Sequence, residues 1–136
     1  ARIAGIGWRN ESYSLNQERL AGLEGFRNSL DDALNMAGLL DASELDLIEL
    51  DCQTGYHELA FKAALGDEVP EFVSPSGGTF AQNPYFCTGM TNAAEAILQV
   101  NGLAGPVQVQ GAQIAAAHGS HGFAQQGNVA VVFEGV

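Results

Sequence analysis

The alternation of apolar and helical patterns along the chain limits the fold more than any other feature of the sequence. Short apolar runs typical of strands occur at 2–8, 45–50, 110–117 and 128–134. Segments with helical spacing of apolar residues lie between them, at 16–38, 55–65 and 83–102. Strands that alternate with helices need crossover connections, whereas the last two strands follow each other directly. The pattern predicts an α/β fold, a mixed sheet of about five strands with helices on both faces and an antiparallel closing pair.

Composition excludes several classes of partner. The chain has 136 residues, 46% of them hydrophobic, which suffices for one domain, 1–136, with a buried core. A net charge of −11 argues against nucleic acid or an anionic membrane as a partner. No apolar run reaches the roughly 18 residues of a membrane span. Cys52 and Cys87 form neither a disulfide framework nor a metal-spaced cluster, so we expect a cytoplasmic protein without a metal site.

Charge is distributed unevenly. All five basic residues lie within the first 62 positions, so a phosphorylated ligand would need most of its counter-charge from elsewhere. An acidic run is expected to form a solvated rim; it comprises Asp41, Glu44, Asp46, Glu49 and Asp51. The chain begins at Ala1, directly in an apolar run, which suggests a processed chain, an excised domain or one half of a larger fold.

The stretch 74–102 has the composition of a binding loop followed by a helix. Gly77 and Gly78 allow positive φ or a close backbone approach. Asn83-Pro84 is typical of an N-cap followed by proline at the first helical position. The helix that follows is apolar enough to be buried nearly all round, and Gly89 permits a close contact. The start of such a helix would favour a negatively charged or polarised oxygen.

These segments together resemble the C-terminal half of the thiolase superfamily, above all the sterol-carrier-protein type and thiolase-like acyl-CoA lyases. The likeness covers essentially the whole chain. It is carried by Ser76-Gly77-Gly78 with Asn83-Pro84 and Gly89, by the next helix, and by a strand leading into His118-Gly119-Ser120-His121-Gly122. It is supported by Ile48-Glu49-Leu50, a short loop and His57-Glu58, where thiolases place Asn-Glu-Ala-Phe or His-Asp-Cys-Phe.

Three departures bear on the chemistry. Asn83 stands where thiolases have the histidine of Gly-His-Pro, and the loop around His118 lacks the cysteine of Cys-x-Gly. Cys52 lies one residue away from the second reactive cysteine of the sterol-carrier type. The resemblance implies that the nucleophilic cysteine and most of the CoA pocket belong to an N-terminal half outside this chain.

Each candidate residue has a catalytic and a structural interpretation. His118 either transfers protons or fixes its loop by hydrogen bonds, and Tyr56 with His57 either lines the acyl pocket or caps a helix. Cys52 is either an acid or base or a small buried residue, and Asn83 either holds an oxyanion or caps a helix. His121 is interpreted as a solvated turn residue and Cys87 as packing. Backbone positions at the substrate are expected at Gly77, Gly78, Gly119 and Gly122.

The resemblance implies part of an enzyme that makes or cleaves a C–C bond in an acyl-CoA thioester, by thiolase or retro-aldol chemistry. Coenzyme A would enter only as part of the substrate, with no separate cofactor. Expected partners are the N-terminal half and a small OB-fold protein with a zinc ribbon, in an oligomer. The alternative is a non-catalytic half that serves as a structural or assembly subunit.

Overall fold

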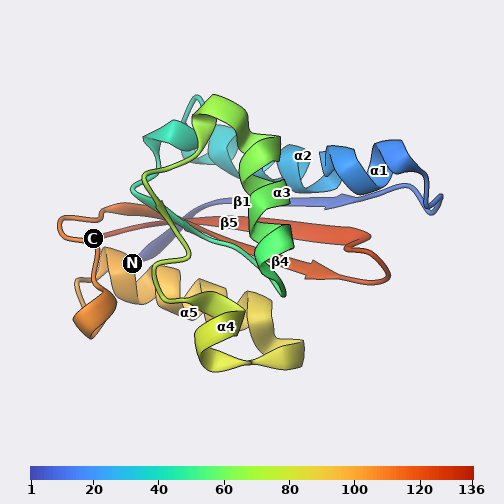
Figure 1. The fold of residues 1–136 in the computed structure, drawn as a ribbon. Helices are drawn as coiled ribbons and strands as arrows, with labels where there is room; N and C mark the ends of the chain where they lie inside the picture. Colours follow the sequence, from blue (N-terminus) through green and yellow to red (C-terminus); the bar gives the residue numbers. More distant parts are fainter.

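A five-stranded mixed sheet runs through the computed structural model, which describes residues 1–136 (Figure 1). Its strand order is β1-β5-β4-β2-β3. The strands are β1 (Arg2–Asn10), β2 (Leu47–Glu49), β3 (Phe72–Val73), β4 (Ile114–His121) and β5 (Gly127–Glu134). β2 is parallel to β3 and β4, while β5 is antiparallel to β4 and β1. The predicted mixed sheet and antiparallel closing pair are confirmed.

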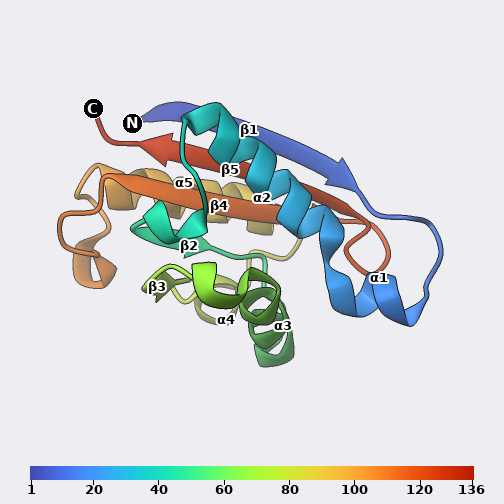
Figure 2. The ribbon, with the colours of Figure 1, turned by 90° about the horizontal axis from the view of Figure 1, so that it is seen from above.

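Helices cover both faces of this sheet (Figure 2). They are α1 (Gln17–Gly22), α2 (Glu24–Ala37), α3 (Gly55–Leu65), α4 (Gly78–Gln82) and α5 (Thr88–Val100). Short 3-10 turns occur at Ala42–Glu44, Gly66–Glu68, Tyr85–Cys87 and Gly105–Val107. One core joins α2 and α3 to the sheet through Phe26, Leu30 and Phe61. The second core, under α5, contains Ala96, Val100 and Phe133. None of the helices is long and apolar enough to cross a membrane.

The first strand, predicted at 2–8 from its apolar residues, is an edge strand of the sheet. Its inward glycines, Gly5 and Gly7, are covered by α2, and a Cβ on either would lie within 2 Å of a helix carbonyl oxygen (1.9 and 1.8 Å). The helix backbone therefore rests directly on β1. The alternate residues Ile6 and Trp8 point to the opposite face, where 46% and 66% of their surface is exposed.

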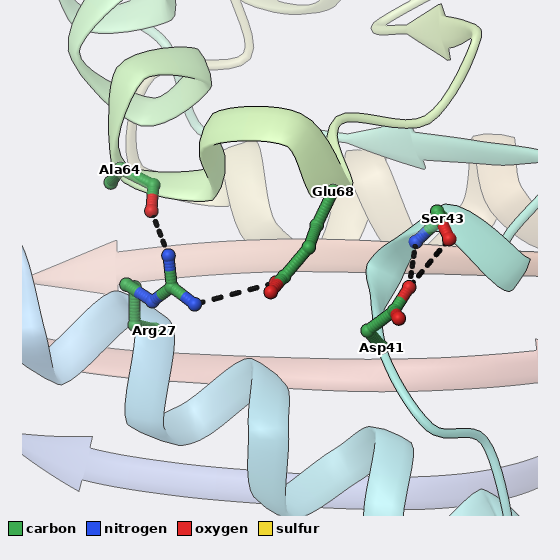
Figure 3. A network of polar contacts seen from close by, with 5 residues as sticks. All are labelled: Arg27, Asp41, Ser43, Ala64 and Glu68. Atoms are coloured by element: carbon green, nitrogen blue, oxygen red, sulfur yellow. Dashed lines mark hydrogen bonds and ion pairs between the residues drawn. The ribbon is translucent and has the colours of Figure 1, made fainter.

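The predicted helix 16–38 is broken at Leu23, whose φ of 49° is left-handed. Asn16 is the N-cap of α1, and its side chain accepts from the backbone N–H of Arg19; Gly38 is the C-cap of α2, at the predicted stop. Arg27 of α2 donates to the carbonyl oxygen of Ala64 and pairs with Glu68, which ties α2 to the end of α3 (Figure 3). The same view shows Asp41 accepting from Ser43 in the turn before β2.

Three expectations about the later part of the chain are wrong. Asn83 is not an N-cap: it ends α4 with a φ of 46°, and α5 begins only at Thr88. α5 is buried on one side only, because Met90 is 77% exposed. The penultimate strand extends past 117 to His121, so His118 lies within β4 instead of following it.

Candidate active site

A cleft of about 670 Å³, here called the main cleft, opens at the carboxyl ends of β2 and β4. Parallel strands that end side by side bring the residues after them to the same edge of the sheet, a common place for ligand sites in α/β proteins. The walls come from the β2–α3 connection, α1, the Tyr85–Cys87 turn, the start of α5 and the β4–β5 loop. Segments distant in sequence therefore form this cleft together.

Asp51 is a buried carboxyl group at this edge. It is 3% exposed, and its Oδ2 accepts hydrogen bonds from the backbone N (2.9 Å) and the Oγ (2.8 Å) of Ser120. Its Oδ1 is buried without a hydrogen-bond partner. The expectation of a solvated rim is therefore wrong for this residue, which the sequence pattern alone did not single out. Its position directly after a predicted strand was the one feature of the sequence that could have identified it as a site residue.

Tyr56 and His57 line the main cleft from the first turn of α3. The helix is capped by Thr54, whose Oγ1 accepts from the backbone N of His57 (3.2 Å), so the two side chains are not needed for capping. The Nδ1 of His57 is buried and has no hydrogen-bond partner, whereas Tyr56 is 76% exposed. Asp51, Tyr56 and His57 are thus brought to one cleft, and His121 lines it as well.

His118 lies in the core beside the cleft instead of on its surface. It is 1% exposed, and its ring centroid is 5.0 Å from those of both Phe26 and Phe61 in edge-on contacts. Its Nε2 is 3.0 Å from Asn128 Oδ1, and its Nδ1 has no partner. Burial lowers the pKa of His118, although the Asn128 hydrogen bond and nearby Asp51 oppose the change. The side chain is therefore neutral at physiological pH.

The two cysteines lie in opposite surroundings. Cys52 is 4% exposed and belongs to the core under α2 and α3. Burial, with the charges of Glu58 and Asp51 as smaller causes, raises its pKa to about 12, so the thiol stays protonated at neutral pH. Cys87 is exposed in the turn before α5, which contradicts its interpretation as packing.

Of Asn83 and the four glycines predicted at the substrate, only Gly122 lines the main cleft. Asn83 lines a smaller cleft of about 400 Å³, which shares Gln53 and Thr88 with the main cleft. Gly77 and Gly78 both have positive φ and lie at the start of α4, away from the main cleft. Gly119 instead allows a helix to approach, because a Cβ there would lie 3.0 Å from the Cα of Gly89.

Glu49 is a second buried carboxyl that the sequence pattern placed in the solvated rim. It is 0% exposed, and its two oxygens accept from the backbone N (3.1 Å) and the Oγ (2.8 Å) of Ser76. Burial raises its pKa to about 7 against the opposing effect of these hydrogen bonds. Glu49 thereby links β2 to the turn before α4. The structure contains no group of three or more His, Cys, Asp or Glu side chains that could hold a metal ion.

Comparisons with known proteins agree with this architecture. The family model described as "Thiolase C-terminal domain-like" matches residues 56–134, more than half of the chain. The crystal structure of human mitochondrial 3-ketoacyl-CoA thiolase is similar over 100% of this chain, with a TM-score of 0.67 and 20% sequence identity. The chain covers 30% of that thiolase chain. No match was found among curated proteins. The chain belongs to the thiolase C-terminal domain-like family.

Proposed function

We propose that this chain supplies one wall of the active site of a thiolase-like enzyme that makes or cleaves a C–C bond in an acyl-CoA thioester. The observation that carries the proposal is the meeting of Asp51, Tyr56 and His57 at the main cleft. Two of these residues have a buried polar atom without a hydrogen-bond partner, Oδ1 of Asp51 and Nδ1 of His57. Unpaired buried polar atoms are costly, and active sites are among the places where they occur.

Asp51 and His57 are proposed as the proton-accepting groups. The hydrogen bonds from Ser120 hold one Asp51 oxygen and leave the other free for a substrate or water proton. The Tyr56 hydroxyl is proposed to polarise the thioester carbonyl or to protonate an enolate. Asn83, in the adjoining smaller cleft, remains a candidate oxyanion donor.

Retro-aldol cleavage fits this set of residues. The base takes the proton of the 3-hydroxyl group, the C2–C3 bond breaks, and the oxygen becomes part of a new carbonyl. The electron pair of the broken bond forms a thioester enolate, which is then protonated at C2. No cysteine nucleophile is needed. Thiolytic cleavage would need one from the other half, because the pKa of Cys52 is about 12 and this thiol lies in the core.

The proposed N-terminal partner would cover exposed apolar side chains of α5 and β1. Met90, Ile97 and Leu98 on the outer side of α5 are 77%, 36% and 37% exposed. Trp8 and Ile6 of β1 are exposed on the sheet face away from α2. Large exposed apolar patches mark interaction sites, and these side chains are proposed to form one. The chain covers only 30% of the matching thiolase chain, which agrees with a missing half.

The test is an assay of the chain combined with its N-terminal counterpart, with a 3-oxoacyl-CoA plus CoA and with a 3-hydroxyacyl-CoA, the products being separated by chromatography. Asp51→Asn is expected to lower kcat at least about 100-fold, the usual effect of losing a general base. Exposed Asp67 provides the matched control, Asp67→Asn. Tyr56→Phe is paired in the same way with Tyr13→Phe, at a tyrosine that is 89% exposed.

The alternative function is a structural or assembly subunit. An assembled wild-type pair that turns over neither thioester would support it and would contradict the enzyme proposal. Wild-type turnover in both Asp51→Asn and Tyr56→Phe would leave the enzyme proposal standing but refute the assignment of these residues.

A further inference from the structure

The loop between β4 and β5 is held in an unfavourable conformation by side chains from other parts of the chain. Ala124 and Gln125 have φ values of 51° and 55°, which residues other than glycine rarely adopt. Arg19 of α1 donates from Nη2 to the carbonyl oxygens of Phe123 and Ala124, both at 3.1 Å. Asn128 donates from Nδ2 to the carbonyl oxygen of Gln125 at 3.0 Å. The loop needs such contacts to keep its shape.

Asn128 is in turn oriented by His118. Asn128 is 3% exposed, and its Oδ1 lies 3.0 Å from His118 Nε2. The reverse orientation of the amide would place Oδ1 against the carbonyl oxygen of Gln125, two acceptors in contact. Oδ1 therefore faces His118, whose Nε2 must carry the hydrogen. Because Nδ1 is buried without a partner, a hydrogen there would have no acceptor, and the imidazole is assigned as neutral with an unprotonated Nδ1.

We propose that His118 is a positioning residue: its Nε2–H orients Asn128, and Asn128 holds the β4–β5 loop against the main cleft. The loop contributes Gly122, Ala124 and Gln125 to the cleft wall. His118 itself does not line the cleft and acts on it only through Asn128. The consequence for catalysis rests on the proposed function, whereas the effect on the loop does not.

The tautomer of His118 is the first test, by ¹⁵N NMR of ring-labelled histidine in the complete protein with both halves present, the signal being assigned with His118→Gln. We expect the Nε2–H form with an unprotonated Nδ1 at neutral pH. Asn128→Asp places a carboxylate against the ring N–H and should raise the pKa of His118 above its wild-type value. A wild-type ring that carries its hydrogen on Nδ1 instead of Nε2 would overturn the proposal.

Cleavage by chymotrypsin after Phe123, which is 75% exposed, is the second test. His118→Leu fills the same space but cannot donate a hydrogen bond, and cleavage in the folded protein should be about five-fold faster. His118→Gln keeps an N–H donor and should restore cleavage close to the wild-type rate. Should the leucine variant fail to fold, Asn128→Ala, which keeps the contacts of the histidine ring with Phe26 and Phe61, should show the same acceleration.

Equal cleavage of wild type and His118→Leu would overturn the proposal, and so would a His118→Gln variant cleaved as fast as His118→Leu. In the thioester assay, His118→Gln should keep most of the turnover that His118→Leu loses. A wild-type protein without thioester turnover would contradict the proposed function alone, because the tautomer and cleavage measurements decide the role of His118 independently.

Discussion

Replacement of Glu49 by glutamine should change how the stability of the chain depends on pH. Glu49 is 0% exposed, and burial raises its pKa from 4.5 to about 7. A carboxyl whose pKa is higher in the folded state binds its proton more tightly there. Its stabilising contribution is therefore complete below about pH 4.5 and is lost as the pH rises through about 7. The difference between these two pKa values corresponds to about 3 kcal/mol of unfolding free energy, at about 1.4 kcal/mol per pH unit.

Glutamine cannot titrate. The free energy of unfolding of Glu49→Gln should therefore not decrease with rising pH as that of the wild type does. Relative to wild type, the variant should gain about 3 kcal/mol between about pH 4.5 and pH 8.5. The new amide matches the donors of Ser76 imperfectly, which changes the free energy of unfolding by an amount that does not vary with pH. The quantity to measure is therefore the slope of the free energy of unfolding against pH. Urea denaturation at a series of pH values provides it. Exposed Glu71 serves as the control, because Glu71→Gln should leave the slope almost unchanged.

A difference between wild type and Glu49→Gln that stays constant over this pH range would refute the reasoning. It would mean that the hydrogen bonds from Ser76 compensate the burial of the carboxylate fully.

Three further predictions concern packing, reactivity and assembly. Gly7→Ala should destabilise the chain by about 3 kcal/mol in urea denaturation, because its Cβ would collide with a backbone oxygen of α2; unchanged stability would contradict this packing. Iodoacetamide at neutral pH should label only Cys87 in the native protein, as peptide mass spectrometry can show, whereas labelling of Cys52 would contradict its burial. Trp8→Asp should weaken binding to the proposed N-terminal half at least about ten-fold by calorimetry, and unchanged affinity would exclude this face from the proposed interface.

The sequence predicted the order of elements well because their patterns are local. α3 was expected at 55–65 and occupies Gly55–Leu65, and α2 ends at Gly38 as its spacing suggested. The glycine positions of the resemblance also led to the correct family. Local patterns failed where tertiary contacts override them. Leu23 breaks an apparently continuous helix, and Asn83 ends a helix instead of starting one.

Some residues of the candidate site could be identified from the sequence, and others only from the tertiary structure. Tyr56 and His57 were identified from the sequence, since their loop carried the resemblance. The partnership of Asp51 with Ser120, 69 positions away, could not be inferred, because only the parallel pairing of β2 with β4 brings them together. The sequence leaves both interpretations of His118 open, because an imidazole suits either role.

What the sequence by itself determined is the α/β order of the chain, its acidic character and its likeness to thiolases. These follow from periodicity, composition and motifs, which need no knowledge of distant neighbours. Only the tertiary structure decided which carboxyl groups are buried, where the main cleft lies and that His118 faces Phe26 and Phe61 in the core. Burial and hydrogen-bond partners depend on contacts between residues far apart in sequence, and these contacts determine the charge and orientation of each side chain.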